Sequence, residues 1–368
     1  MTTDVTSIDP APPIVDLVIA IHDARRPLAA AIASLRHQGL SLGTQLRVTV
    51  VCHNIPIDEI EALLSASDRD AVRLMSCNDG IPSPAGPFTA GLAAATGRYV
   101  SVMGSDDSLE PGALAAWVAR AERYSFAAVI APVRLPNGAI VRTPPRRPGR
   151  RAALDPVKDR LAYRTAPLGL VRRDVVTRLG LSFTPGVTTG EDHEFSLPLW
   201  FSGEPVGYAA GDPAYRVGSG VAPRVTETPR PADELVRAIE LLIDQRWVRA
   251  LPASSRHAIV VKLLRVHVFA LAARSSIGAG WLTGEREHVA ALVRDLIALA
   301  PTATDVLAIA DRDLLDALLD VSTDSAELVR LAHRRRRFGT PATMLTRSPR
   351  HLLAREAPVR FMVASALV

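Results

Sequence analysis

The sequence is poor in lysine, cysteine and aromatic residues, and each shortage narrows the class of protein. Lysine occurs only at positions 158 and 262, so the 43 basic residues are almost all arginine. A GC-rich genome and selection for anionic partners explain this bias toward arginine equally well. Two cysteines, Cys52 and Cys77, give no disulfide framework and fit a reducing compartment. Aromatic residues make up 5% of the chain, too few for base stacking, so we expect no nucleic-acid partner.

Long apolar runs are also missing. Residues 1–13 are polar and proline-rich, without the basic start and apolar stretch of a secretory signal, and we expect them to be disordered. The most apolar later stretch, 258–273, contains Lys262, Arg265 and His267 and is too short to span a bilayer. These absences predict a cytoplasmic protein. Peripheral contact with the inner face of a membrane stays open.

The composition that remains is that of a globular protein with a substantial core. Of the 368 residues, 48% are hydrophobic and 22% are charged, with a formal net charge of +5. This length favours two structural units over one.

Short apolar runs alternate with segments of helical spacing in the first half of the chain. The expected strands cover residues 15–21, 46–51, 72–75 and 99–103. The expected helices cover residues 27–35, 57–64 and 88–95. Repeated strand–helix units of this length predict an α/β fold with a doubly wound, mainly parallel sheet.

The pattern changes twice further along the chain. Residues 137–154 are rich in proline and arginine and predict a surface loop on the rim of the sheet's site, where its arginines either meet phosphate or are solvated. From residue 231 onward helical periodicity dominates, which predicts an all-α C-terminal domain over 231–368. Its basic end, including 334–337, either lies on an anionic membrane surface or packs on its own domain.

Two adjacent carboxylates follow the strand expected at 99–103. Asp106 and Asp107 come directly after it, and Pro111 then opens a helix. Open α/β sheets bind ligands at the carboxyl edge of their strands, where a carboxylate pair can hold Mg²⁺ or Mn²⁺ against a diphosphate. Alternatively, the pair forms a polar turn and caps the following helix.

A second acidic cluster spans residues 188–195, which read Thr-Thr-Gly-Glu-Asp-His-Glu-Phe. Gly190 permits an unusual turn, and acidic side chains suit the first turn of a helix. The cluster is either an acidic helix start or a catalytic element in which Asp192 acts as a general base. Its side chains do not show the spacing of a zinc site.

The order of these motifs resembles the family-two glycosyltransferases, inverting enzymes of the GT-A fold that use nucleotide-sugar donors. The resemblance covers about residues 14–220. It rests on an opening strand and helix, an "N-x-G…G-L-x-x-A-x-G-x-Y" segment, a DxD-type metal motif, a strand and helix before the acidic motif, and a "G-E-D-x-x-F" motif. These segments are residues 18–38, 78–100, 105–111, 170–180 and 190–195.

The resemblance implies a catalytic domain over residues 14–230 and a helical accessory domain over 231–368. It implies that Asp106 and Asp107 hold a divalent cation, Mg²⁺ or Mn²⁺, which stabilises the leaving diphosphate. Asp192 would take the proton of the acceptor hydroxyl, and a single displacement would invert the sugar. The implied donor-binding residues are Ile21, His22, His53, Asn54, Asn78, Gly80, Ser105 and Asp106. Side chains implied on the acceptor side or at phosphate are Glu191, His193, Arg172 and Arg216.

The implied partners are a nucleotide-sugar donor and a glycan or lipid-linked acceptor, in the synthesis of bacterial cell-envelope glycans or polysaccharides. A homo-oligomer formed through the helical region stays open. The sequence identifies neither the sugar, nor the nucleotide, nor the acceptor.

The chain departs from the family pattern at two donor positions. After the second strand it reads Val51-Cys52-His53-Asn54 in place of an acidic run, so His53 or Asn54 is expected to bind the base. Gly104 replaces the first acid of the metal motif. These losses keep a second hypothesis open, a catalytically degenerate GT-A-like protein that binds a glycan or a partner. A nucleotidyltransferase is disfavoured because residues 22–27 contain no glycine for a phosphate loop.

Overall fold

Seven strands form the central sheet of the computed structural model, which describes residues 11–219, 230–273 and 281–367. Their order across the sheet is β3-β2-β1-β4-β8-β6-β9, and neighbours are parallel except where β8 meets β4 and β6. The mainly parallel sheet expected from the sequence is confirmed. The strands are β1 (Val15–Ile21), β2 (Leu46–His53), β3 (Val72–Cys77), β4 (Tyr99–Gly104), β6 (Ala128–Ile130), β8 (Gly169–Arg172) and β9 (Val206–Tyr208).

Both faces of the sheet are covered, which explains why its strands are almost continuously apolar. On β1, Leu17 and Ile19 join one core cluster and Val18 joins the other. The first cluster includes side chains of α1 (Leu28–Leu35), α2 (Ile57–Glu61) and α5 (Ala113–Tyr124), and the second includes side chains of α4 (Ala85–Ala93), α6 (Arg173–Leu179) and α7 (His193–Phe201). The short helix α3 (Ala66–Arg69) buries none of its side chains.

A small second sheet lies beside the carboxyl end of β4. It consists of β5 (Ser108–Leu109), β10 (Tyr215–Arg216) and β7 (Val133–Arg134), in that order. Because β10 pairs with β5 just after the two adjacent aspartates, the chain near residue 216 lies close to residue 108. A single 3-10 turn, η1 (Leu161–Tyr163), precedes β8.

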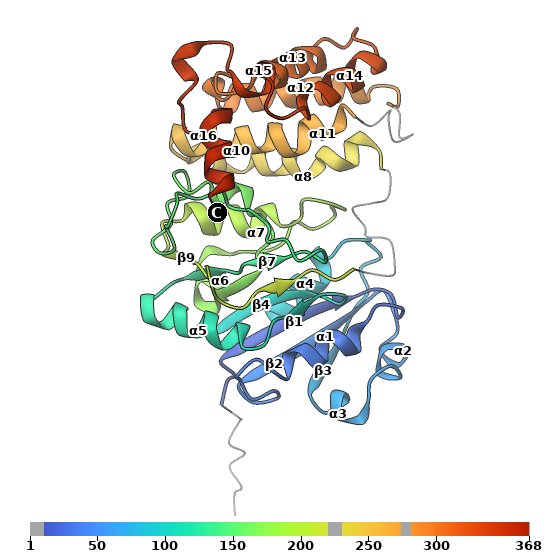
Figure 1. Ribbon diagram of the computed structural model, residues 1–368. Coiled ribbons are helices and arrows are strands. Elements are labelled where there is room, and N and C mark those ends of the chain that lie inside the picture. Colours follow the sequence, from blue (N-terminus) through green and yellow to red (C-terminus); the bar gives the residue numbers. More distant parts are fainter. Residues whose placement is uncertain (1–10, 220–229, 274–280, 368) are drawn as a thin grey trace, which may run out of the picture.

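The C-terminal part of the chain is helical, as the sequence predicts, and stacks above the sheet layer (Figure 1). It has no strand within residues 230–273 and 281–367. Its main helices are α8 (Ala232–Asp244), α9 (Arg246–Ala250), α10 (Ala253–Leu263), α11 (Phe269–Leu271), α12 (Glu285–Leu299), α13 (Ile309–Leu319), α14 (Ser325–Arg335), α15 (Pro341–Met344) and α16 (Pro358–Ala366). Shorter turns are the π-helical η3 (Leu264–Val268) and the 3-10 turns η5 (Pro301–Thr304) and η6 (Pro349–His351).

The helical region and the sheet share one apolar core. A single cluster of buried side chains runs from Val18 on β1, through Phe195 on α7 and Ile239 on α8, to Leu328 on α14. Helix α7 lies between the sheet and helices α8 and α10 in Figure 1. The start of α7, where the second acidic motif lies, is therefore enclosed by both parts of the chain.

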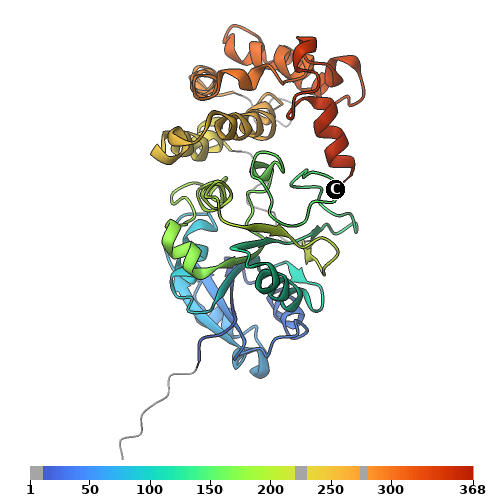
Figure 2. The same ribbon diagram turned by 90° about the vertical axis from the view of Figure 1, so that its left-hand side faces the viewer.

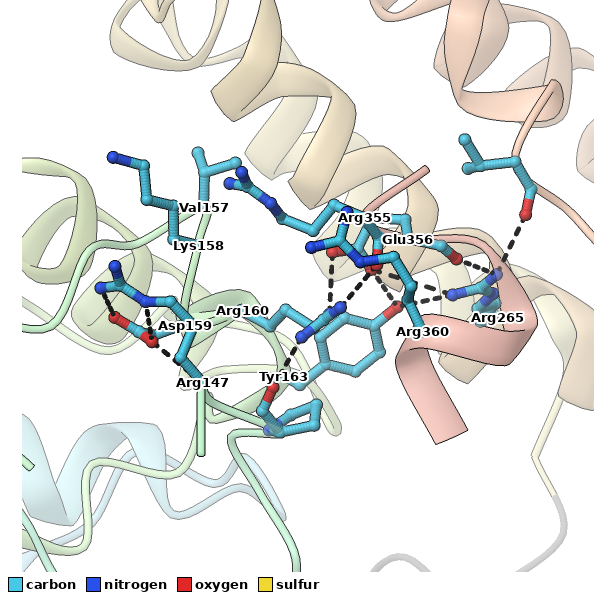
Figure 3. Close-up of polar contacts among 12 residues, drawn as sticks. Arg147, Val157, Lys158, Asp159, Arg160, Tyr163, Arg265, Arg355, Glu356 and Arg360 are labelled. Atoms are coloured by element: carbon cyan, nitrogen blue, oxygen red, sulfur yellow. Dashed lines mark hydrogen bonds and ion pairs between the residues drawn. The ribbon is translucent and has the colours of Figure 1, made fainter. Parts of the chain in front are cut away.

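The proline- and arginine-rich loop does not line the rim of the sheet's site, contrary to our expectation. Arg146 is 7% exposed and stacks on Tyr208, with its guanidinium carbon 4.1 Å from the ring centroid. Arg147 pairs with Asp159 at 2.6 Å. These arginines are held by protein groups because the loop packs under the C-terminal segment (Figures 2 and 3).

A buried polar network ties the C-terminal segment to both parts of the chain (Figure 3). Arg160 donates to the carbonyl of Arg355 at 2.5 Å and its Nε lies 3.2 Å from the Glu356 carboxylate. Arg265, on η3, donates to the Glu356 carbonyl at 2.7 Å. Glu356 is 3% exposed, and buried charges of this kind are stable only when they are paired and hydrogen-bonded.

Part of the basic C-terminal stretch packs on its own region, one of the two alternatives that the sequence left open. Arg334 pairs with Asp313 at 2.5 Å, and Arg335 pairs with Asp311 at 2.6 Å. Within the described residues, no helix combines the length and the apolar character that a membrane crossing requires. Of the N-terminal segment expected to be disordered, residues 1–10 lie outside the described residues, and Pro13 is buried with its carbonyl accepting the Arg98 N–H.

Candidate active site

A cavity of about 530 Å³ opens at the carboxyl ends of β1, β2 and β4. Parallel strands that end at one edge of a sheet bring the residues that follow them together, and this edge is where α/β folds bind ligands. Six of the eight predicted donor-binding residues line the cavity: Ile21, His22, His53, Asn54, Ser105 and Asp106. Asp107, Glu191 and Tyr215 line it as well.

Asp106 meets a cation that the sequence analysis did not assign. Arg26 Nη1 lies 2.8 Å from Asp106 Oδ1, and the two side chains are only 10% and 7% exposed. Arg26 comes from the turn after β1 and also lines the cavity. Burial, followed by the positive charge of Arg26, lowers the pKa of the neighbouring His22, so this imidazole is neutral at pH 7. The cavity lining thus contains a guanidinium, paired with Asp106, of the kind that binds phosphate.

Asp107 is engaged in holding the structure together. Its Oδ2 accepts the hydroxyl of Tyr215 and its Oδ1 accepts the N–H of Gly218 at 2.8 Å. Burial and the Asp107 charge raise the pKa of Tyr215 well above its usual range, so the phenol stays a donor. A side chain at Gly104 would place its Cβ 2.6 Å from Asp107 Oδ2, which accounts for glycine in place of an acid.

The contacts of Asp106 and Asp107 decide whether a divalent cation fits this cavity. Asp106 offers a carboxylate at the cavity surface, the hard ligand that Mg²⁺ and Mn²⁺ prefer, and such ions need only one or two carboxylates beside a diphosphate. Asp107 fits this role poorly because both of its oxygens already accept hydrogen bonds from the chain around β10. Asp106 is therefore the better placed of the two predicted ligands.

At the far end of the cavity, His53 forms the centre of a polar cluster. His53 Nε2 lies 2.8 Å from Asp79 Oδ1, and the Asn54 amide lies 3.0 Å from the same imidazole nitrogen. The Asn54 carbonyl oxygen accepts the N–H of Gly80 at 2.9 Å. Burial alone would raise the pKa of Asp79, but the N–H of Ile81 and the His53 side chain lower it.

The same cluster is a second place where a metal ion could bind. One ligand atom each from His53, Cys77 and Asp79 lie within 4.8 Å of one another. The three residues come from the ends of β2 and β3, which are neighbours in the sheet. The sequence analysis missed this set because it considered Cys77 only as a disulfide partner of Cys52 and did not assign a role to Asp79.

The second acidic motif begins α7 at the opposite wall of the cavity. Gly190 has a φ of +77°, and a Cβ there would lie 3.0 Å from the Ala238 methyl, so glycine is required on both counts. Glu191 lines the cavity, and Asp192 is the N-cap residue of α7. Burial raises the pKa of Glu191 to about 7, with a contribution from the charge of Asp192. Burial also raises the pKa of Asp192, against the attraction of Lys262.

His193 turns away from the cavity, contrary to our expectation of an acceptor or phosphate contact. It is 1% exposed, and its Nε2 lies 2.8 Å from Lys262 Nζ on α10. The cause is helical geometry, because successive residues at the start of α7 point in different directions. Burial lowers the pKa of His193 well below its usual value.

Comparison with known proteins identifies the sheet region. Residues 16–180 match the model of the family described as glycosyl transferase family 2. The succinoglycan biosynthesis protein ExoO of Rhizobium meliloti (strain 1021) is 30% identical over 116 residues, which is 32% of this chain and 32% of that protein. Residues 16–180, which make up less than half of the chain, are similar to this family and are here called the family 2 domain. The match spans about a third of the length of the curated relative.

Solved structures resemble the family 2 domain and the helical region together. The crystal structure of S. aureus TarS 1–349 in complex with UDP-GlcNAc has a TM-score of 0.70 at 15% identity, covering 89% of this chain and 93% of that one. The crystal structure of TarS 1–349 by itself has a TM-score of 0.66, with 89% and 92% covered. These likenesses establish the GT-A fold with its helical C-terminal region.

Four predicted site residues lie elsewhere than expected. Arg172 pairs with Asp174 at 2.5 Å and lies at the amino end of β4, because β8 runs antiparallel to β4. Arg216 is exposed on β10 and is not among the residues that line the cavity. Asn78 bonds to Ser76 at 3.0 Å, and it and Gly80 are likewise absent from the lining.

The cavity also contains residues that the sequence analysis did not assign. Arg26, Phe88 and Thr188 line it, together with the turn Pro82–Pro84. Arg26 could have been found from the sequence, because it follows the first strand at the edge where the aspartates were placed. Phe88 could not, because a partly buried aromatic residue at helical spacing is indistinguishable from a core residue.

Proposed function

We propose that this protein is an inverting glycosyltransferase that moves a sugar from a nucleoside diphosphate donor to an acceptor hydroxyl. One observation carries the proposal: a single cavity is lined by Asp106, after β4, and by Glu191, at the start of α7. The two residues are far apart in the sequence, and a donor bound between them would have its diphosphate and its sugar on different walls. The family 2 match supports this reaction class.

Arg26 and Asp106 act on the diphosphate in this proposal. The guanidinium of Arg26 places a fixed positive charge where the leaving diphosphate gathers negative charge, and charge placed in advance is what accelerates such a step. A divalent cation held through Asp106 would add further charge stabilisation when bound. His53 and Asn54 hold the nucleobase end, through imidazole and amide groups in place of the usual carboxylate.

Asp192 acts as the general base. It is partly exposed but is not among the residues that line the cavity, whereas the adjacent Glu191 is, so in this proposal Asp192 acts from the cavity edge, on the side of the sugar opposite the diphosphate. Removal of the hydroxyl proton during attack from that side gives inversion in one displacement. Glu191, with its pKa near 7, contacts the acceptor and is partly protonated at neutral pH.

We further propose a uridine diphosphate sugar as donor and a polysaccharide or lipid-linked glycan as acceptor, with the protein working in the cytoplasm at the inner face of the membrane. UDP-GlcNAc is bound in the TarS crystal structure, and ExoO is named for succinoglycan biosynthesis. Both likenesses support a role in cell-envelope or polysaccharide synthesis.

The test is a thermal-shift screen of nucleotide sugars with and without Mn²⁺, followed by an assay of UDP release. A donor at 100 times its Kd stabilises the folded state by about 2.7 kcal/mol, which is about 3 °C for a chain of this size. We expect this rise with a UDP-sugar, larger with Mn²⁺, and slow UDP release. Donor binding without release, even with glycan acceptors added, would favour the degenerate binding protein. No rise with any nucleotide sugar would refute the proposal.

A further inference from the structure

A buried lysine from the helical region lies against the start of α7. Lys262, on α10, is 3% exposed, and its Nζ lies 2.8 Å from His193 Nε2 and 2.8 Å from His267 Nε2. Burial lowers the pKa of both imidazoles, that of His267 to about 3, so both are neutral hydrogen-bond acceptors for an ammonium. Two neutral acceptors do not balance a buried positive charge, which requires a nearby anion.

Asp192 is the acidic residue whose charge acts on Lys262. It directly precedes His193, and its attraction opposes the burial that lowers the pKa of Lys262 to about 8. Lys262 in turn opposes the burial that raises the pKa of Asp192. The ionisable groups gathered here are Glu191 and Asp192 before α7, His193 on α7, Lys262 on α10 and His267 on η3, while α8 contributes the Ala238 methyl.

The backbone of the helical region is built to form this cluster. The π-helical turn η3 (Leu264–Val268) directly follows Lys262. In a π-helix, residues five apart share a side, and Lys262 and His267 are five apart. An uninterrupted α-helix would separate these two side chains around its circumference. Single π turns inside helices are rare and occur frequently at functional sites.

We propose that Lys262 is a positioning residue, supplied by the helical region, that keeps Asp192 ionised as the base of the transfer reaction. This inference rests on the proposed function, in which Asp192 accepts the acceptor's proton. Asp192 needs such a partner because it is partly buried and lies beside Glu191, and both conditions disfavour its charged form. The helical region then contributes to the chemistry as well as to the packing.

The test is an NMR titration that requires no donor. In protein labelled with ¹³C-aspartate, the Asp192 carboxyl signal is assigned by its loss in Asp192→Asn and followed against pH. An opposite charge nearby lowers a carboxyl pKa by about 1 to 3 units, so we expect Lys262→Met to raise the Asp192 midpoint by at least about 1 unit. Lys262→Arg keeps the charge and should restore the midpoint. Lys158→Met removes the other lysine, which is exposed, and should leave the Asp192 midpoint unchanged.

A reciprocal measurement covers the case in which Lys262→Met does not fold. With ¹³C-lysine labelling only two side chains are visible, and Asp192→Asn should lower the midpoint of Lys262 while leaving that of Lys158 in place. Unchanged midpoints in both experiments would overturn the proposal. Since neither readout depends on turnover, a failed donor screen with shifted midpoints would refute the proposed function and leave the coupling standing. UDP release together with unshifted midpoints would support the proposed function and refute the coupling between Lys262 and Asp192.

Discussion

Glu191 is predicted to make the stability of this protein fall between pH 4.5 and pH 7. Its pKa is raised from 4.5 to about 7, mainly by burial. A group whose pKa is higher in the folded state than in the unfolded state contributes stability below its unfolded pKa, and this stability is lost as the pH rises through the folded pKa. Glu191→Gln removes this dependence, because glutamine stays neutral at every pH.

The magnitude follows from the size of the pKa change. At about 1.4 kcal/mol per pKa unit, the rise corresponds to about 3 kcal/mol, and the partial exposure of Glu191 reduces this to about 2 kcal/mol. The unfolding entropy of about 2.1 cal/mol/K per residue gives about 0.8 kcal/mol per degree for 368 residues. The melting temperature of Glu191→Gln relative to the wild type should therefore rise by about 3 °C between pH 4.5 and pH 8.

Differential scanning calorimetry across this pH range measures the effect. Glu61→Gln, at an exposed position on α2, is the matched control, and its difference from the wild type should not vary with pH. The carboxylates elsewhere in the protein titrate in all three proteins and cancel in the comparison. If the difference for Glu191→Gln stays constant within about 1 °C, the assignment of Glu191 as a buried, half-protonated acid is wrong.

Three further predictions concern the packing and charge around the cavity. Tyr215→Phe removes the phenol hydroxyl that donates to Asp107 and should cost about 1–3 kcal/mol in chemical denaturation. Gly91→Ala places a Cβ 2.3 Å from a β1 side chain and should cost about 1–3 kcal/mol by overpacking, seen as a lower melting temperature. Arg26→Met leaves the Asp106 carboxylate unpaired and should cost about 3 kcal/mol. Mn²⁺ should stabilise Arg26→Met more than the wild type in a thermal-shift assay; equal stabilisation would count against Asp106 as the metal ligand.

The sheet could be predicted from the sequence because its strands are buried on both faces. Continuous apolar runs such as residues 15–21 have few other interpretations, and the structure gives the strand the same bounds. The site residues on the carboxyl edge followed from the same argument, because parallel strands end together. Asp106 was assigned to this edge in this way and His53 through the family resemblance, and both line one cavity.

The residues placed incorrectly depend on directions that a linear pattern does not contain. Arg172 lies at the opposite edge because β8 is antiparallel, and nothing in a four-residue apolar run reveals its direction. His193 points to α10 because Lys262, 69 residues later, packs there. Arg26 could be placed at the cavity edge from the sequence, but its pairing with Asp106, which comes from another strand, could not. Such pairings are fixed by tertiary packing, which the local sequence does not specify.

The central claim, that Asp106 in the cavity and Asp192 beside the lining residue Glu191 serve one reaction, is tested most directly by comparing Asp106→Asn and Asp192→Asn. Binding of UDP-GlcNAc with Mn²⁺ by isothermal titration calorimetry and UDP release are measured on both variants and the wild type. We predict that Asp192→Asn binds the donor as the wild type does and releases UDP at least about 100 times more slowly. Asp106→Asn should lose donor affinity and its dependence on Mn²⁺. UDP release at the wild-type rate by Asp192→Asn would contradict the account.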